Sequence, residues 1–367
     1  MQPLSENLRL IHKSAEIFRN ELYMKRILIL LIALGISLHL NAQKTLSSQD
    51  SIKTFYNELF SALKKSYLHR KNINWKEVEP QLKERLQGYD NFQKSLSEIK
   101  PLFDKIGATH CQVYVNKVKY AGTGKKITKD DYSEQLKKKH ESKPNFEVKV
   151  LNGKYGYVLI PGMVFFDTSP VYIHNLAQPL YDQIADIKTK NKLEGWIVDL
   201  RLNTGGNSTP MLLALYDLLG DNEIWGSLDI NKKQINKYYL SKGRYMEGNK
   251  NPAYINPKGA LLDREKVAVI TGVFTGSSGE VTALAFKGRP NTIFIGESTF
   301  GATTGNMFWP LPFDNVMALT NSYDSDRNGN YYEQIIPDVR VSKQDNFDDL
   351  LLDENIREAI RYISTSK

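Results

Sequence analysis

The segment Lys266–Glu280, KVAVITGVFTGSSGE, constrains the fold of this chain more than any other stretch. Its apolar first half is typical of a buried strand, and it runs into a turn of small residues that carries Ser277 and Ser278. From Val281 onward, apolar residues recur at i, i+3 and i+4, which is the spacing of one helix face. The segment therefore predicts a strand, a tight turn and a helix in immediate succession.

Such a turn places the Ser277 hydroxyl at a helix N-terminus, where free backbone N–H groups and the helix dipole favour a developing negative charge. A nucleophilic serine beside an oxyanion hole needs this setting. A simpler interpretation also fits, because Ser277 and Glu280 form S-x-x-E, the capping-box pattern. For this segment alone the cap is the commoner explanation, since helix caps far outnumber nucleophiles.

Three signatures, which follow one another along the chain, favour the nucleophilic serine over the simple helix cap. They are D-x-R-x-N-x-G-G at Asp199–Gly206, T-x-S-x-x-E at Thr275–Glu280 and G-E-x-T-x-G at Gly296–Gly301, preceded by His110 in G-A-T-H-C at the start of an expected strand. Together, over roughly 250 residues, they resemble the carboxyl-terminal-processing (tail-specific) serine protease family. The relatives of that family include the tricorn core protease and the interphotoreceptor retinoid-binding protein.

Strands and helices alternate from residue 106 onward, with strands expected at Tyr155–Ile160 and Thr292–Gly296 and a helix over Ser208–Leu219, which predicts an α/β core. The resemblance implies a ClpP/crotonase-like spiral core over 106–367, with a Lys-rich surface insertion at about 117–145. Helical spacing of apolar residues predicts a small helical region over 43–105. Only about 40 residues separate His110 from the next expected strand, too few for the PDZ domain that processing members usually carry.

One departure from the family pattern decides the expected chemistry. Processing members use a Ser–Lys dyad whose lysine follows the last glycine of G-E-x-T-x-G, but this chain has Ala302 there and no lysine before Lys343. The resemblance therefore points to the lysine-free, tricorn-like branch, which pairs the serine with a histidine. His110 occupies the position of the family's histidine, although an ordinary histidine at a strand end is the alternative interpretation.

The resemblance assigns the remaining roles. Glu333, in Y-Y-E-Q-I-I-P-D, matches the late glutamate that orients the histidine, and Thr109 stands where the tricorn branch has a serine that hydrogen-bonds this carboxylate. Glu333 as a solvated hairpin residue and Thr109 as a plain strand residue are the alternatives. The backbone N–H groups of Ser278 and Gly206 are the expected oxyanion donors, and Gly205 is the second choice for the latter.

These residues predict a serine endopeptidase that acts through an acyl-enzyme on Ser277, with peptides or unfolded proteins as substrates. The alternative is a catalytically weak member that serves as a peptide- or ligand-binding scaffold, as in the retinoid-binding relatives. A crotonase-type acyl-CoA enzyme is disfavoured by the nucleophile-style turn. No cofactor and no metal is expected, since Cys111 is the single cysteine and no Cys-based metal site can form.

Residues 24–42 have the form of a secretory signal, with a Lys-Arg start, an apolar run and a small residue, so cleavage is expected after Ala42. The run is short for a membrane span, which predicts a soluble periplasmic or extracellular protein without stable membrane insertion. Met24 is a possible true start. A net charge of +8 without a concentrated basic, aromatic face does not favour nucleic-acid binding, and nothing indicates an oligomeric state.

Overall fold

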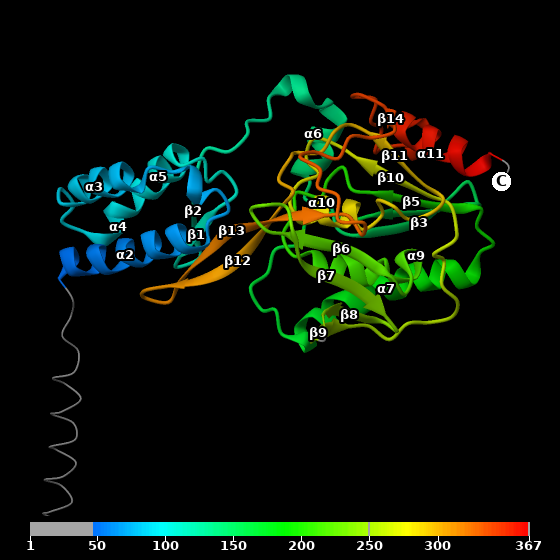
Figure 1. Ribbon diagram of the computed structural model, residues 1–367. Helices are drawn as coiled ribbons and strands as arrows, with labels where there is room; N and C mark the ends of the chain where they lie inside the picture. Colours follow the sequence, from blue (N-terminus) through cyan, green and yellow to red (C-terminus); the bar gives the residue numbers. More distant parts are fainter. Residues whose placement is uncertain (1–46, 249, 366–367) are drawn as a thin grey trace, which may run out of the picture.

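The computed structural model describes residues 47–248 and 250–365, so the expected signal segment and its cleavage point after Ala42 lie outside the described residues. Two β-sheets form the body of the molecule, with helices packed on both faces of the parallel sheet (Figure 1). An α-helical unit at the amino-terminal end lies beside the tip of a long hairpin. The mixed α/β fold class that the sequence predicts is confirmed.

The parallel sheet carries the three signature segments. Its strand order is β14, β11, β10, β5, β4 and β3; all neighbours are parallel except β3, which pairs antiparallel with β4. Strands β4, β5 and β10 are buried along their whole length, as is usual for parallel strands covered on both faces. The bounds are β3 (Glu147–Leu151), β4 (Tyr155–Leu159), β5 (Gly195–Asp199), β10 (Val267–Thr271), β11 (Thr292–Gly296) and β14 (Val339–Arg340).

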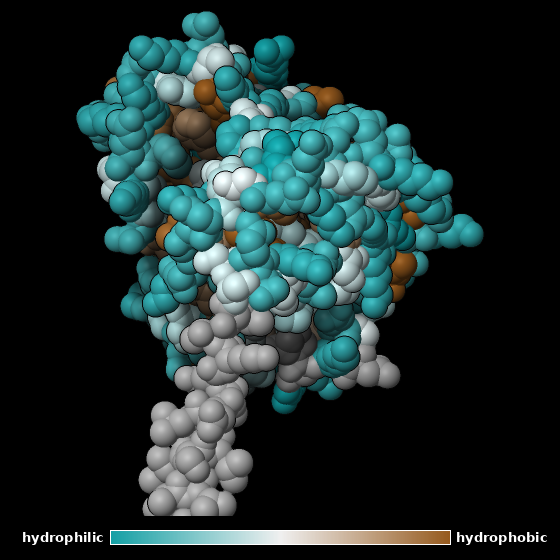
Figure 2. All heavy atoms as spheres, turned by 90° about the vertical axis from the view of Figure 1, so that its left-hand side faces the viewer, coloured by the Kyte–Doolittle hydropathy of each residue, from teal (hydrophilic) through white to brown (hydrophobic). Residues whose placement is uncertain are grey.

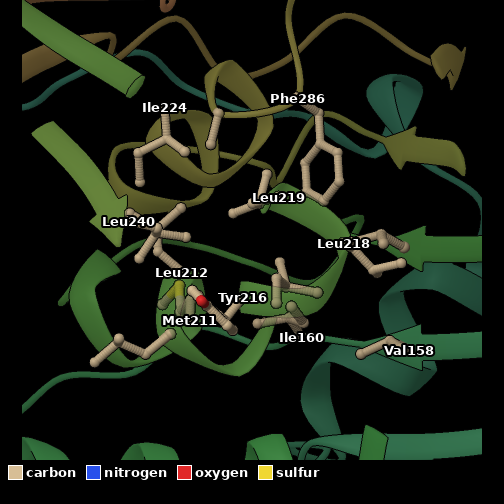
Figure 3. Close-up of a cluster of buried hydrophobic side chains, with 14 of the residues drawn as sticks. Val158, Ile160, Met211, Leu212, Tyr216, Leu218, Leu219, Ile224, Leu240 and Phe286 are labelled. Atoms are coloured by element: carbon tan, nitrogen blue, oxygen red, sulfur yellow. The ribbon is translucent and has the colours of Figure 1, made fainter. Parts of the chain in front are cut away.

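Alternate residues of these strands supply two different cores. In β10, Val267 and Val269 join a cluster under α7, α8 and α10, whereas Ala268 and Ile270 join a second cluster under α11. Figure 3 shows part of the first cluster, where strand and helix side chains interlock. The covering helices are α6 (Glu134–Glu141), α7 (Pro170–Lys190), α8 (Ser208–Ala214), α9 (Tyr216–Leu219), α10 (Ser278–Leu284) and α11 (Glu354–Ser364), with short 3-10 turns η3 (Lys129–Asp131) and η4 (Leu350–Leu352).

The second sheet is antiparallel and connects the amino-terminal helices to the core. Its order is β2, β1, β13, β6, β7, β8 and β9, and β12 pairs with β13 as a long hairpin. The bounds are β1 (Gln112–Val115), β2 (Val118–Ala121), β6 (Glu223–Leu228), β7 (Gln234–Ser241), β8 (Arg244–Glu247), β9 (Lys250–Tyr254), β12 (Thr304–Leu311) and β13 (Asn315–Ser325).

The amino-terminal helices pack their apolar faces on this hairpin. Phe55, Leu59 and Leu63 of α2 are fully buried in one cluster with Met317 and Leu319 of β13. The elements of this unit are α2 (Ser48–Ser66), η1 (Arg70–Asn72), α3 (Trp75–Leu86), α4 (Phe92–Ser95), η2 (Leu96–Glu98) and α5 (Ile99–Lys105). The face of the molecule on this side is largely hydrophilic, with small hydrophobic areas scattered over it (Figure 2). Among the described helices, none combines the length and the apolar character needed to cross a bilayer.

Arg201, in the D-x-R signature, anchors the carboxyl end of β5 to the segment that leads into α11. Its guanidinium is 2% exposed and pairs with Asp199, Asp345 and Asp353, each at 2.7 Å. A buried cation is tolerated only when it is paired and hydrogen-bonded, as it is here. The glycine turn that follows at Gly205 and Gly206 therefore starts from a rigid base.

Candidate active site

The structure brings the hydroxyl of Ser277 and the imidazole of His110 together. Nε2 of His110 lies 3.0 Å from Oγ of Ser277, although 167 positions separate the two residues in the chain. Ser277 lies in the turn between β10 and α10, and His110 lies in the turn between α5 and β1. The parallel sheet and the helical unit thus each contribute one member of the pair.

The turn at Ser277 is strained and held in place by Glu280. Ser277 has φ +53° and ψ −119°, an uncommon conformation for a residue with a side chain that costs on the order of 1–3 kcal/mol. The fully buried Glu280 carboxylate accepts hydrogen bonds from the backbone N–H groups of Ser277 (2.9 Å), Gly301 (2.9 Å) and Ala302 (2.7 Å) and from the Thr299 hydroxyl (2.5 Å). Burial raises the pKa of Glu280, and these donors oppose that rise.

The capping box and the nucleophile are therefore compatible interpretations of the same residues. Glu280 caps the backbone of Ser277 and joins it to the loop that leads into β12, while the Ser277 hydroxyl remains within hydrogen-bond distance of His110.

On its other side, His110 contacts Thr304, the first residue of β12. Nδ1 lies 2.7 Å from the Thr304 hydroxyl oxygen. Burial lowers the pKa of His110 from its ordinary value to about 4, so the imidazole is neutral at neutral pH. For Nε2 to accept the Ser277 proton, Nδ1 must carry the hydrogen, and Thr304 then accepts it.

The structure does not place Glu333 in the orienting position that the resemblance implies. The hydrogen-bond partner of Nδ1 is the Thr304 hydroxyl. Glu333 is exposed and lines a cleft beside His110, and it forms no hydrogen bond with His110. Its backbone carbonyl accepts from the Thr303 hydroxyl, which pins this stretch against the start of β12. Thr109 is also exposed and lines the same cleft, and its hydroxyl contacts no carboxylate among the described residues.

The glycine turn after β5 lies against Ser277. The N–H of Gly205 donates to Oδ1 of Asn203 at 3.1 Å and the N–H of Asn207 donates to the Met163 carbonyl at 2.7 Å, so both are engaged within the protein. Within the described chain, no hydrogen bond engages the N–H of Gly206 or of Ser278. The Ser278 hydroxyl donates to the Gly206 carbonyl at 2.7 Å, which ties the two turns together.

Gly206 can hold this position because it has no side chain. Its φ of +113° lies in the region that favours glycine, and a Cβ there would be 2.0 Å from the Met163 carbonyl oxygen. Of the two glycines that the sequence left open, the geometry favours Gly206 as an oxyanion donor beside Ser278.

Among the described residues, no lysine forms a hydrogen bond with Ser277 in place of the one that the signature lacks at position 302. Ala302 is buried, and its N–H is bound by Glu280. Within the part of the chain that the structure describes, no group of three or more His, Cys, Asp or Glu side chains is arranged to hold a metal ion. The Ser277–His110 pair by itself can support serine-based acyl transfer.

A cleft of about 390 Å³ opens beside the pair. His110 and Thr304 form part of its wall, together with Glu333 and two lysines, Lys125 and Lys232. Neither Ser277, Ser278 nor Gly206 lines it, so the cleft borders the Thr304 side of His110.

Comparison with known proteins identifies the signature-bearing part of the chain. The model of the family described as "Peptidase family S41" matches residues 154–341, just over half of the chain. A curated relative, the nisin-resistance protein of Lactococcus lactis subsp. lactis, is 34% identical over 155 residues, which cover 42% of this chain and 48% of the relative. The chain thus spans about half the length of this curated relative.

Two solved structures share most of the fold. A lipoprotein from Streptococcus agalactiae aligns with a TM-score of 0.61 at 23% identity, covering 87% of this chain and 96% of that one. A putative peptidase from Parabacteroides merdae aligns with a TM-score of 0.54 at 15% identity, covering 86% and 98% of the two chains. Because these alignments extend well beyond residues 154–341, the likeness in fold includes the amino-terminal helical part.

Proposed function

Because the chain belongs to peptidase family S41, we propose that it is an exported serine peptidase that cleaves peptides or unfolded proteins through an acyl-enzyme on Ser277. The observation that carries this proposal is the 3.0 Å contact between Ser277 Oγ and His110 Nε2. A binding scaffold that performs no hydrolysis has no need for this pair on a strained turn beside two free N–H groups, so we favour the enzyme.

In the proposed reaction, His110 takes the proton of Ser277 while Oγ attacks the carbonyl carbon of the scissile bond. The N–H groups of Gly206 and Ser278 then bind the oxyanion. His110 returns its proton to the leaving amine, and a water molecule activated by the same imidazole releases the acyl group. Base catalysis of this kind typically contributes 10²–10⁴-fold.

Thr304 takes the orienting role in this scheme in place of Glu333. A hydroxyl stabilises the imidazolium less than a carboxylate does, so the buried imidazole stays a weak base, in keeping with its lowered pKa. The strain at Ser277, held by Glu280, keeps the hydroxyl aimed at His110 before substrate arrives.

Export is part of the proposal and rests on the signal-like residues 24–42. The similar structure from Streptococcus agalactiae is described as a lipoprotein, which is in line with a protein that acts outside the cytoplasm. We propose that the mature chain begins near Gln43 and works in the periplasm or outside the cell.

Incubation of the purified chain with unfolded casein tests the proposal. Wild-type protein is expected to produce fragments, and Ser277→Ala none above background. Ser142→Ala changes an exposed serine within the Lys-rich segment; it is the matched control and should behave as wild type. Equal fragment yields from wild type and Ser277→Ala would show that this serine is not the nucleophile.

A further inference from the structure

The loop between β4 and α7, residues 160–169, exposes two large apolar side chains (Figure 1). Val164 is 72% exposed and Phe166 is 55% exposed. The Phe166 ring packs edge-on against Tyr114 of β1, with 5.4 Å between the ring centres. Val164 is therefore the exposed apolar side chain of this loop whose surroundings the ring contact does not explain.

Hydrogen bonds fasten this loop to the glycine turn after β5. The N–H of Met163 donates to the Gly205 carbonyl at 2.9 Å, and the Met163 carbonyl accepts from the N–H of Asn207 at 2.7 Å. The N–H of Phe165 donates to Oδ1 of Asn207 at 3.2 Å. The side chains of Met163 and Phe165 pack against the core, so that of Val164 between them points outward. Because both of its neighbours are held, Val164 keeps a fixed position relative to the turn.

Val164 lies against the residue that supplies one of the expected oxyanion donors. A Cβ built on Gly206 would lie 3.1 Å from Cγ2 of Val164. The same turn adjoins Ser277, since a Cβ built on Gly205 would lie 2.8 Å from Cβ of Ser277. A carbonyl oxygen held by the N–H of Gly206 would lie about 2.7–3.1 Å from that nitrogen. Val164 therefore borders the place where the carbonyl group under attack would be bound.

The roles of Ser277 and His110 indicate which substrate residue meets Val164. The carbonyl that Ser277 attacks belongs to the residue before the scissile bond, whereas the imidazole protonates the amine of the residue after it. Val164 contacts the glycine turn, and the cleft that His110 lines includes neither Val164 nor Gly206. The side chain nearest to Val164 is therefore that of the residue that forms the acyl-enzyme.

We propose that Val164 selects the side chain that precedes the scissile bond and favours an apolar one. This inference rests on the proposed peptidase function and names a specificity-determining residue within it. An apolar substrate side chain laid against Val164 removes both groups from water, which is favourable. A charged side chain would lose hydration there without gaining a partner from the loop, because residues 160–166 contain no charged side chain.

A library of random-sequence octapeptides, N-acetylated and C-amidated, tests the preference. Mass spectrometry of the products gives the residue on each side of every cut. Relative to their abundance in the library, we expect apolar residues before the cut at least about threefold more often than charged residues. A wild-type profile without this bias would overturn the inference.

The variants Val164→Asp and Val164→Lys test the side chain itself. Val164→Asp should raise the ratio of Lys and Arg to apolar residues before the cut by at least about threefold, and Val164→Lys should do the same for Asp and Glu. An exposed ion pair and the loss of the apolar wall each shift this ratio modestly, and the two effects multiply. The control Val118→Asp places the same charge on an exposed valine of β2, at the end of the antiparallel sheet, and should keep the wild-type profile.

Thermal unfolding checks that each variant keeps the fold. An unchanged profile in both Val164 variants, or an equal change in Val118→Asp, would refute the inference while leaving the peptidase intact. A change confined to the residue after the cut would refute the assignment of Val164 to the acyl side.

If wild-type protein cuts neither the library nor casein, the peptidase function fails. Val164 is then judged by affinity selection of the same library on immobilised Ser277→Ala protein and on Ser277→Ala/Val164→Asp. At least about threefold enrichment of Lys and Arg among the peptides that the second protein retains, absent from Ser277→Ala/Val118→Asp, supports contact of Val164 with a bound peptide. Equal composition of the retained peptides refutes it.

Discussion

Replacing Thr304 by valine removes the hydroxyl that accepts a hydrogen bond from Nδ1 of His110. It nearly preserves the volume of the side chain. The Nδ1–H of the imidazole then loses its acceptor in a buried setting. An unsatisfied buried donor costs about 1–3 kcal/mol, and the lost hydrogen bond would have strengthened as the imidazolium formed. At 1.36 kcal/mol per factor of ten, kcat/KM should fall about 5- to 150-fold.

The assay is steady-state cleavage of one internally quenched peptide, chosen from the cuts found in casein. Thermal unfolding of each variant checks that the fold is kept. Thr304→Ser retains the hydroxyl and should lie within about threefold of wild type, because the hydrogen bond rather than the methyl group is at issue.

The variant Glu333→Gln decides between Thr304 and Glu333 as the group that orients His110. When an orienting carboxylate of a Ser–His–Asp triad is neutralised, kcat drops by about 10⁴-fold. In this structure Glu333 does not contact the imidazole, so we expect a change of less than about threefold. A loss of about 10³-fold or more in Glu333→Gln, with Thr304→Val close to wild type, would refute the assignment and restore Glu333 as the orienting group.

Four other predictions rest on the same geometry. Because burial lowers the pKa of His110 to about 4 and only the neutral imidazole accepts a proton, kcat/KM should stay level from pH 7 to about 5 and fall with a midpoint near 4; a midpoint near 6.5 contradicts this. Because the pKa of His110 is lower in the folded chain than in the unfolded chain, the unfolded chain binds a proton at His110 at a higher pH. The free energy of unfolding, measured in urea, should therefore decline as pH falls from about 6.5 to 4, and the decline should be smaller in His110→Gln. Gly206→Ala should lower kcat about 10²–10³-fold, because a Cβ would displace the turn from the Met163 carbonyl and misplace an oxyanion donor; unchanged kinetics would exclude that donor. Arg201→Met leaves three buried aspartates without their cation and should cost at least about 3–5 kcal/mol in urea denaturation, whereas a loss below 1 kcal/mol would show that the cluster is dispensable.

The central strands of the parallel sheet were predictable because β4, β5 and β10 are buried along their whole length. The strand expected at Thr292–Gly296 has the same bounds as β11, and the one expected at Tyr155–Ile160 differs from β4 by a single residue. Strands covered on both faces appear in a sequence as continuous apolar runs between turns. The helix expected over Ser208–Leu219 is instead divided into α8 and α9 at Leu215.

The antiparallel strands between 223 and 254 were not predicted. In β7 the first four residues are all exposed, so the strand lacks the alternation of buried and exposed positions that marks a half-covered sheet. Long-range pairing holds such strands in place, and one sequence does not reveal which partner they find.

The structure brings Ser277 and His110 together, as the sequence led us to expect, whereas the contact of Thr304 with His110 was not anticipated. Ser277 is marked by its turn, and His110 by its position in the family pattern. Thr304 is one of several threonines after the last motif, and it reaches His110 only because β12 starts beside a residue 194 positions away. Glu333 matched a sequence position whose side chain, in this fold, faces a cleft instead of the imidazole.

Labelling with a fluorophosphonate probe tests most directly whether Ser277 is an activated nucleophile. Intact mass and peptide mapping of the folded wild-type chain should show a single adduct, located on Ser277, and the adduct should form far more slowly in His110→Ala. Absence of the adduct from folded protein, or its appearance on Ser277 at the same rate without the imidazole, would contradict the account.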